Sequence, residues 1–286
     1  MDEALALPPP RRASSAVLSG TIVGLLGFLT VAPLYLWIHG LQAKDKSAAA
    51  LAMSSMHMSQ MDKYWSFPIL QATGIAGLIW AYVGVTLGLL ESSRTISWIP
   101  LGRPQLDRLH RQISLLVISL MAIHVAATAF DAMGDSWRTV TIPWEWSNQG
   151  WPQAVTGYTT GIVAFYLALV LGPTYYVRRT IGIGRWRFLH RFVVVVYILS
   201  FWHTMILGLD VAHYGWVRPF MWLMQIPLLV LFARRLTQPA AARRGSTDSL
   251  TARVVVGEGL AFASWAAVAV IGAIVVTGHS DFINTV

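Results

Sequence analysis

Seven stretches of roughly 20 mainly apolar residues limit what this chain can fold into. A helix of that length crosses the hydrocarbon core of a bilayer. A soluble domain has no apolar interior large enough to bury seven such helices. The composition agrees, because 55% of the 286 residues are hydrophobic and only 12% are charged, against about 25% charged in soluble domains. We therefore predict an all-α integral membrane protein, a polytopic bundle of about seven transmembrane helices. The predicted spans are 15–38, 68–90, 109–130, 155–177, 188–207, 219–236 and 257–277.

The positively charged residues predict the orientation of this bundle. Arginine is concentrated before the first span and around the second, fourth and sixth connections, while the other connections hold few Lys or Arg residues. Because cytoplasmic loops are enriched in Lys and Arg, we expect a cytoplasmic N-terminus and a C-terminus outside the cell. This bias and attraction to anionic lipid account for the net charge of +8, so no nucleic-acid partner is expected. The arginines concerned are Arg11, Arg12, Arg94, Arg103, Arg108, Arg111, Arg178, Arg179, Arg185, Arg187, Arg191, Arg234, Arg235, Arg243, Arg244 and Arg253.

The chain contains no cysteine. This absence excludes disulfides, iron–sulfur clusters, thiolate-ligated haem and haem attached covalently through a C-x-x-C-H motif. A redox cofactor would therefore have to be held by histidine or by noncovalent contacts alone.

Four of the eight histidines lie in two predicted spans, His110 and His124 in the third, and His190 and His203 in the fifth. One return span separates these two helices, so they run parallel and place His110 level with His190 and His124 level with His203. Spacings of fourteen and thirteen residues correspond to rises of about 21 Å and about 19.5 Å along an α-helix. These rises suit two haems stacked across a hydrocarbon core about 30 Å thick, since neutral imidazole is a good iron ligand.

The two spacings differ in the rotation that they produce. At about 100° per residue, a residue fourteen positions after another points within about 40° of the same direction around the helix axis. A residue thirteen positions after another points about 140° away. We therefore expect the fifth span to bend, to contain a π-type bulge, or to hold differently rotated haems. Each histidine also needs an acceptor for its second ring nitrogen, and the sequence does not identify one.

Matching Leu-His-Arg triplets surround the first histidine of each helix, at residues 109–111 and 189–191. Haem carries two propionates, which arginines at the membrane boundary can neutralise through charge-assisted hydrogen bonds. The alternative is that these arginines only mark the cytoplasmic face. The candidate propionate contacts are Arg108, Arg111, Arg187 and Arg191.

Two segments carry a family resemblance, Asp107-Arg-Leu-His-Arg-Gln through His124 and Trp186-Arg-Phe-Leu-His-Arg through His203. They resemble the ferric reductase-like transmembrane domain. That superfamily includes the membrane haem domain of NADPH oxidases, metalloreductases and the haem subunit of a bacterial methionine sulfoxide reductase system. The NADPH oxidases share the spacings of fourteen and thirteen residues, and the resemblance covers roughly the second to the sixth span.

The resemblance implies two bis-histidine b-type haems, and it makes Tyr197 a candidate for an aromatic side chain between them, with ordinary packing as the alternative. The flavin- and nicotinamide-binding domain of the reductases is not expected here, so electrons would come from a partner, a flavin bound elsewhere or quinol. The implied ligands are His110 with His190, and His124 with His203. The expected division is a cytoplasmic lead at 1–14, a first span and outer loop at 15–67, the haem-binding bundle at 68–236, a cytoplasmic connection at 237–256, and an additional span with a short outer tail at 257–286.

The first outer loop contains a second candidate site, a Met-x-x-Met-His-Met-x-x-Met pattern. Thioethers together with imidazole suit Cu(I), because soft ligands select soft metals. The alternative is an apolar methionine patch that packs on the membrane or on a partner. The candidate copper ligands are Met53, Met56, His57, Met58 and Met61.

We predict a multi-pass protein of the bacterial plasma membrane that transfers electrons from a cytoplasmic or membrane donor to an extracytoplasmic acceptor. The candidate acceptors are ferric or cupric ion, oxygen and a redox protein, which would make the chain a ferric reductase-like oxidoreductase. Two alternatives stay open at this point. One is a quinol-linked cytochrome b subunit of a respiratory complex, and the other is a haem-free transporter or accessory protein whose histidines relay protons.

Overall fold

The computed structural model describes residues 13–53, 55–92, 102–130, 136–145 and 152–237, and every regular element in these ranges is a helix. Within these ranges, five helical segments are long and apolar enough to cross a membrane, which confirms the prediction of an all-α multi-pass membrane protein. A sixth apolar segment, Val217–Ala233, is shorter. The predicted seventh span at 257–277 lies outside the described residues. The five segments are Val17–Gln42, Ser66–Glu91, Pro104–Ala129, Val155–Tyr175 and Ile183–Leu207.

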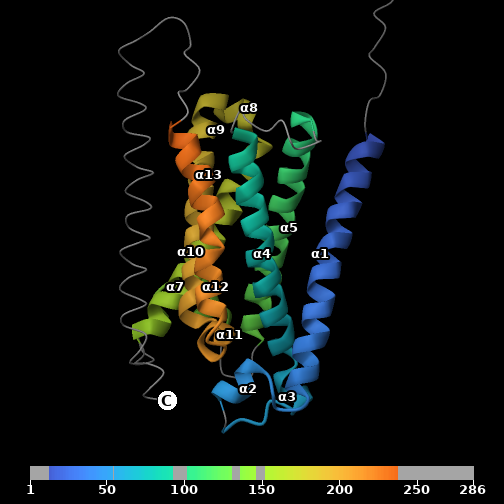
Figure 1. Ribbon diagram of the computed structural model, residues 1–286, viewed down its shortest axis with the longest axis vertical. Helices are drawn as coiled ribbons and strands as arrows, with labels where there is room; N and C mark the ends of the chain where they lie inside the picture. The colour runs from blue at the N-terminus through green and yellow to red at the C-terminus, as the bar shows by residue number, and fades with distance from the viewer. Residues whose placement is uncertain (1–12, 54, 93–101, 131–135, 146–151, 238–286) are drawn as a thin grey trace, which may run out of the picture.

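The long helices are joined by short ones at both ends of the bundle (Figure 1). The long helices are α1 (Ala13–Gln42), α4 (Ser66–Ser92), α5 (Arg103–Ala129), α7 (Pro152–Leu171), α10 (Val193–Leu207) and α13 (Gln225–Thr237). The short ones are α2 (Ala48–Ala52), α3 (Met61–Tyr64), α6 (Trp137–Thr141), η2 (Pro173–Tyr175), α8 (Arg178–Ile181), α9 (Ile183–His190), α11 (Leu209–His213) and α12 (Val217–Leu223). We refer to the end that carries α8 and α9 as the α8 end, and to the end that carries α2, α3 and α11 as the α2 end.

Large apolar side chains cover much of the surface of the long helices. On α1, for example, the side chains of Leu18 and Phe28 are 63% and 65% exposed. A helix that is apolar on all sides is stable in hydrocarbon, whereas in water such a continuous exposed patch would drive association. The surface therefore agrees with burial of these helices in lipid.

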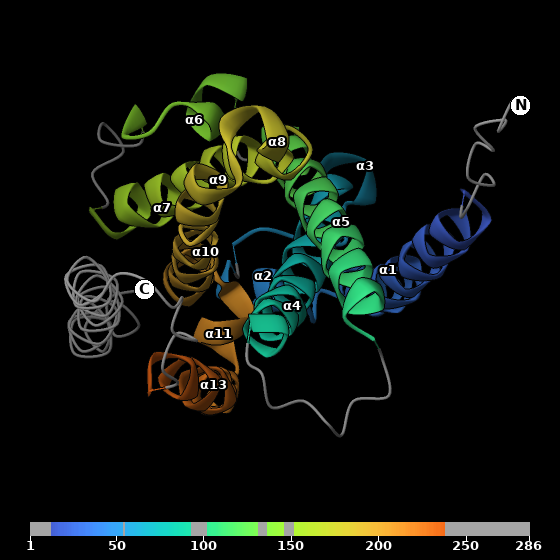
Figure 2. The same ribbon diagram turned by 90° about the horizontal axis from the view of Figure 1, so that it is seen from above.

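The central helices are arranged as two closely packed pairs, α4 with α5 and α7 with α10 (Figure 2). Small residues allow the close approach, since Ala164 of α7 is fully buried against α10 in a cluster with Val196. Small side chains at helix contacts are typical of membrane proteins, in which close packing supplies much of the stability. α1 packs on the outside of α4 and α5, and α13 packs on α4.

The predicted sixth span is divided into α12 and α13 at Met224. Pro227 falls in the first turn of α13, where the missing backbone N–H removes no helical hydrogen bond. Buried Gln225 stands at the start of α13, and its Nε2 donates to the carbonyl of Met221 at 2.9 Å. A proline and a buried amide therefore account for the break in this apolar segment.

Candidate functional site

The four intramembrane histidines form two facing pairs. The ring centroids of His110 and His190 are 6.0 Å apart, and those of His124 and His203 are 5.9 Å apart. The two rings of each pair are nearly perpendicular, at 88° and 90°. The first pair (His110 and His190) lies toward the α8 end, and the second pair (His124 and His203) lies toward the α2 end. The structure thus brings together the residues that the sequence analysis placed at equal depths.

The separation within each pair suits two imidazoles bound to opposite faces of one metal atom. A metal–imidazole bond is about 2 Å long and the bonded nitrogen lies about 1.1 Å from the ring centre, so two opposed ligands have centres about 6.2 Å apart. The observed separations are 6.0 and 5.9 Å. Among the described residues, no group of three or more His, Cys, Asp or Glu side chains could hold a metal ion. Two imidazoles alone do not complete the coordination of an iron atom, and a macrocycle would supply the remaining ligands.

Three of the histidines have the hydrogen-bond acceptor that the sequence did not identify. In each case Nδ1 faces a backbone carbonyl of the neighbouring helix within its closely packed pair. A carbonyl only accepts, so Nδ1 carries the proton and Nε2 is left with its lone pair, which is the form that binds iron. The three contacts are His110 Nδ1 to Gly84 O at 3.0 Å, His124 Nδ1 to Leu70 O at 2.9 Å, and His203 Nδ1 to Gly157 O at 2.9 Å.

A glycine stands four residues after each of these carbonyls. Residues four apart share a helix face, so the glycine lies beside the imidazole that the carbonyl binds. A Cβ atom would be 3.2 Å from the His110 ring at Gly88, 3.0 Å from the His124 ring at Gly74 and 2.5 Å from the His203 ring at Gly161. The glycines therefore create the space in which these rings lie. These glycines of the second and fourth spans could have indicated where the imidazoles lie, but they were not selected from the sequence.

His190 lies against an aromatic side chain. It ends α9, and its ring stacks on the indole of Trp186 one turn earlier, with centroids 5.1 Å apart and planes 24° apart. The indole plane therefore fixes the plane of this imidazole. The first pair thus combines one ring bound to a carbonyl with one ring stacked on an aromatic side chain.

A local change of helical winding brings His190 and His203 to matching positions. Between α9 and α10 four amides bond to the carbonyl three residues earlier, which is 3₁₀ winding. Each such residue adds about 20° of rotation and about 0.5 Å of rise relative to an α-helix. The offset of about 140° thus falls to about 60°, and the rise grows to about 21.5 Å, close to that of α5. The four bonds are Arg191 to Phe188, Phe192 to Leu189, Val194 to Arg191 and Val195 to Phe192.

The structure shows an interruption of the helix with tighter winding, which was not among the three solutions expected for the fifth span. A π-type bulge, which winds less tightly, does not occur in residues 183–207. The matching depth of the two pairs therefore depends on backbone geometry that the spacing alone did not specify.

The arginines at the α8 end are not equivalent. Arg111 is paired with Asp107 at 3.5 Å and lies over the ring of Tyr175 at 4.8 Å. Arg187 and Arg191 are exposed, and Arg108 is half-buried. Arg178 was not among the predicted propionate contacts, and its Cζ is 3.9 Å from the centre of the Tyr175 ring and 5.5 Å from that of Trp186. These two aromatic residues belong to separate short helices, η2 and α9, whose packing brings both rings to Arg178.

Tyr197 is buried and is held against α13. Its hydroxyl donates to Gln225 Oε1 at 2.9 Å, and its ring lies in a cluster with Leu89 of α4 and Leu228 of α13. Its role between two haems stays a prediction.

The Met- and His-containing loop covers the α2 end. Met58 is fully buried in a cluster with residues of α2 and α3, and Met53 and Met56 pack against that cluster. The side chain of His57 is 77% exposed, and its Nδ1 is 3.7 Å from Asp45 Oδ2. Met61 Sδ accepts a hydrogen bond from Gln42 Nε2 at 4.0 Å. Packing therefore accounts for Met58, and copper binding by this loop stays a prediction.

Asp45 organises the same loop through hydrogen bonds. Its carboxylate accepts from the backbone amide of Ser59 at 2.7 Å and from the Ser59 hydroxyl at 2.8 Å. These bonds, with a smaller contribution from His57, lower the pKa of the Asp45 carboxyl below its usual value. The loop is therefore closed most firmly when this carboxyl is ionised.

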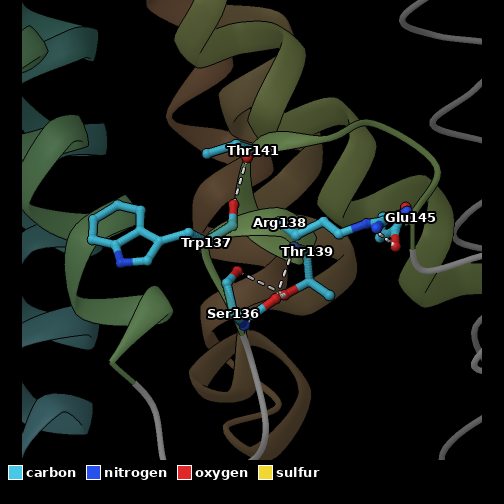
Figure 3. Close-up of polar contacts among 6 residues, drawn as sticks. All are labelled: Ser136, Trp137, Arg138, Thr139, Thr141 and Glu145. Atoms are coloured by element: carbon cyan, nitrogen blue, oxygen red, sulfur yellow. Dashed lines mark hydrogen bonds and ion pairs between the residues drawn. The ribbon is translucent and has the colours of Figure 1, made fainter.

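The segment after α5 also packs at the α2 end. Figure 3 shows that Ser136 caps α6, with its hydroxyl accepting from the Thr139 amide at 3.3 Å and its own amide donating to Thr139 Oγ1 at 2.8 Å. Arg138 Nε is 2.7 Å from Glu145 Oε1 (Figure 3). This ion pair neutralises the one arginine that the sequence places in this connection. The ring of Trp137 meets that of Phe130 with centroids 5.7 Å apart.

A protein-family model described as "Ferric reductase like transmembrane component" matches residues 73–201 of this chain. The matched region runs from α4 to α10 and includes both members of the first pair and His124 of the second. His203 lies two residues beyond it. No curated protein and no solved structure matches the chain.

Proposed function

We propose, from the match of residues 73–201 to the ferric reductase-like transmembrane component, that this protein carries electrons across a membrane through two b-type haems. The observation that carries the proposal is the repeated geometry of the histidine pairs, whose ring centres are 6.0 and 5.9 Å apart. The family match favours electron transfer in general, whereas the paired rings point to particular ligands. His110 and His190 would hold the first haem, and His124 and His203 the second.

The residues around the histidines suit this cofactor. Three carbonyls hold Nδ1 as the donor, so that Nε2 is available to iron without a change of tautomer. Glycines open the space beside the same three rings. When bound, the two haems supply reversible one-electron chemistry, and the chain supplies fixed imidazoles and an apolar surrounding that limits access of water.

We assign the α8 end to the cytoplasm. Arg108, Arg111 and the arginines of α8 and α9 lie there, whereas the cations of the α2 end are fewer and several are accompanied by acidic residues. A cytoplasmic or membrane donor would then deliver electrons at the α8 end. An extracytoplasmic acceptor, which could be ferric or cupric ion, oxygen or a redox protein, would receive them at the α2 end.

The purified protein tests the proposal directly. We expect a Soret band, a split α-band after reduction, and two haems per chain by the pyridine haemochrome assay. His124→Ala and His203→Ala should each remove the second haem and leave the first in place. His213→Ala, at an exposed position at the end of α11, is the control and should retain both haems.

Two results would contradict the proposal. A colourless preparation from haem-supplemented cells would leave only the haem-free transporter or accessory protein. Retention of two haems by both second-pair variants would show that the ligands are other residues.

A further inference from the structure

The rings of the first pair contact different kinds of side chain and backbone groups. His110 has a carbonyl and a glycine of α4 beside it, whereas the ring of His190 lies against Trp186 at 5.1 Å with planes 24° apart. Residues four apart on a helix share a face, so Trp186 and His190 point to the same side of α9. The aromatic side chain that lies against His190 therefore also contacts other groups.

Trp186 belongs to a corner formed with Tyr175 and Arg178, which we call the α8 corner. The guanidinium Cζ of Arg178 lies 3.9 Å from the centre of the Tyr175 ring and 5.5 Å from that of Trp186, both within the range of cation–π attraction of about 6 Å. The two rings meet at 77° with centroids 5.9 Å apart. The Tyr175 hydroxyl donates to Asp107 Oδ2 at 3.2 Å, which ties the corner to α5.

The Tyr175 hydroxyl of the α8 corner has Asp107 as its acceptor, whereas Trp186 and Arg178 face no acceptor side chain among the described residues. The indole Nε1–H of Trp186 is buried and has no hydrogen-bond partner among the described residues. The described residues also provide no carboxylate within ion-pair distance of Arg178, whereas Arg111 has Asp107. A buried donor without an acceptor is unfavourable, and a guanidinium is suited to a carboxylate. The indole N–H and the guanidinium would therefore both be satisfied by a carboxylate that does not belong to this chain.

We propose that the α8 corner binds a propionate of the first haem, and that Trp186 and Arg178 are positioning residues for that haem. The inference rests on the proposed function, because the propionate is present only if the first pair holds haem. The indole would use its face to orient His190 and its N–H to meet the carboxylate. Arg178 suits this role better than Arg187 and Arg191, because those two side chains are exposed.

The position of Arg178 allows its effect on the reduction potential of the first haem to be estimated. The two centroid distances of 5.5 and 5.1 Å place the guanidinium within about 11 Å of the His190 ring. A positive charge at this distance favours the reduced haem, which carries one positive charge fewer. With an effective dielectric constant of about 20, loss of a charge about 11 Å away should shift the reduction equilibrium roughly tenfold toward the oxidised form. A tenfold shift corresponds to 59 mV for one electron.

The test uses the full-length protein in a His124→Ala background, so that only the first haem is observed. Arg178→Gln should lower its midpoint potential by that amount and shift the propionate bending mode in resonance Raman spectra. Arg179→Gln makes an equal change of charge at the exposed neighbouring position and is the control. It should change neither the midpoint potential nor the propionate mode. Trp186→Phe keeps a ring against His190 and removes the N–H, so it should shift the propionate mode but preserve the low-spin electron paramagnetic resonance signal. Trp186→Leu should change both the propionate mode and the low-spin signal.

The results separate the two proposals. If the wild-type protein contains no haem, the proposed function fails and this inference fails with it. If haem is bound, but Arg178→Gln behaves like Arg179→Gln and Trp186→Phe leaves the propionate mode unchanged, only the inference is overturned. Agreement of the Arg178 and Trp186→Phe variants with expectation supports it even if Trp186→Leu does not fold.

Discussion

Gly161 of α7 provides the sharpest test of the second histidine pair. A Cβ atom at this position would lie 2.5 Å from His203 Nδ1 and 2.8 Å from its Cε1, whereas ordinary van der Waals contact begins at 3.4 Å. Gly161→Ala therefore requires the imidazole and α7 to separate by roughly 0.9 Å, while metal–ligand distances tolerate only about 0.2 Å. The same movement would break the Nδ1 hydrogen bond to Gly157 O, now 2.9 Å long.

The energetic cost can be estimated from these two effects. Overpacking costs typically about 1–3 kcal/mol, and loss of the hydrogen bond adds about 1 kcal/mol. A total near 3 kcal/mol corresponds to an affinity of the second pair for haem that is weaker by about two orders of magnitude. We expect Gly161→Ala to lose the second haem preferentially, as measured by haemochrome content and by titration of apoprotein with haem.

Substitutions at two further glycines, Gly88 and Gly24, are the controls for Gly161→Ala. At Gly88 the Cβ would be 3.2 Å from His110 Cε1, so the ring needs to move by only a few tenths of an ångström and Gly88→Ala should weaken the first haem slightly. At Gly24 of α1 nothing lies within 4 Å, and Gly24→Ala should leave both haems in place. If Gly161→Ala retained both haems with unchanged affinity, close approach of α7 to His203 would not be what positions this ligand.

Three further predictions concern the winding of the fifth span and the polar contacts of the α2 end. Insertion of one alanine after Val193 should turn His203 by about 100° and remove only the second haem, which is measured by haem content, whereas retention of two haems would refute the winding argument. The pKa of Asp45 is lowered by its bonds from Ser59, so the stabilisation is present above the usual carboxyl pKa and is lost as pH falls through the lowered value. Faster amide exchange in the 53–61 loop on acidification, absent in Asp45→Asn, would confirm this, and a pH-independent loop would contradict it. Glu145→Gln breaks an ion pair whose arginine side chain is 72% exposed, so the free energy of unfolding should change by less than about 1 kcal/mol and both haems should remain, while loss of haem would give Glu145 a larger role.

The sequence predicted the elements of the fold better than their interruptions. Apolar stretches of sufficient length specify membrane helices, because a lipid-exposed backbone must satisfy its hydrogen bonds internally. The tighter winding between α9 and α10 was not among the three alternatives expected for the fifth span, since a spacing of thirteen residues does not say how the extra rotation is supplied. The division at Met224 was visible only as a proline inside a short span.

The candidate site shows the same division. The positions of the four histidines in the sequence were enough to predict that they meet, because two parallel helices place residues of similar spacing at similar depths. The groups that hold them became visible only in the folded protein: the carbonyls of Gly84, Leu70 and Gly157, and the ring of Trp186 against His190. A spacing along one helix specifies depth and direction, whereas an acceptor on a neighbouring helix depends on the packing of two surfaces that lie far apart in the chain.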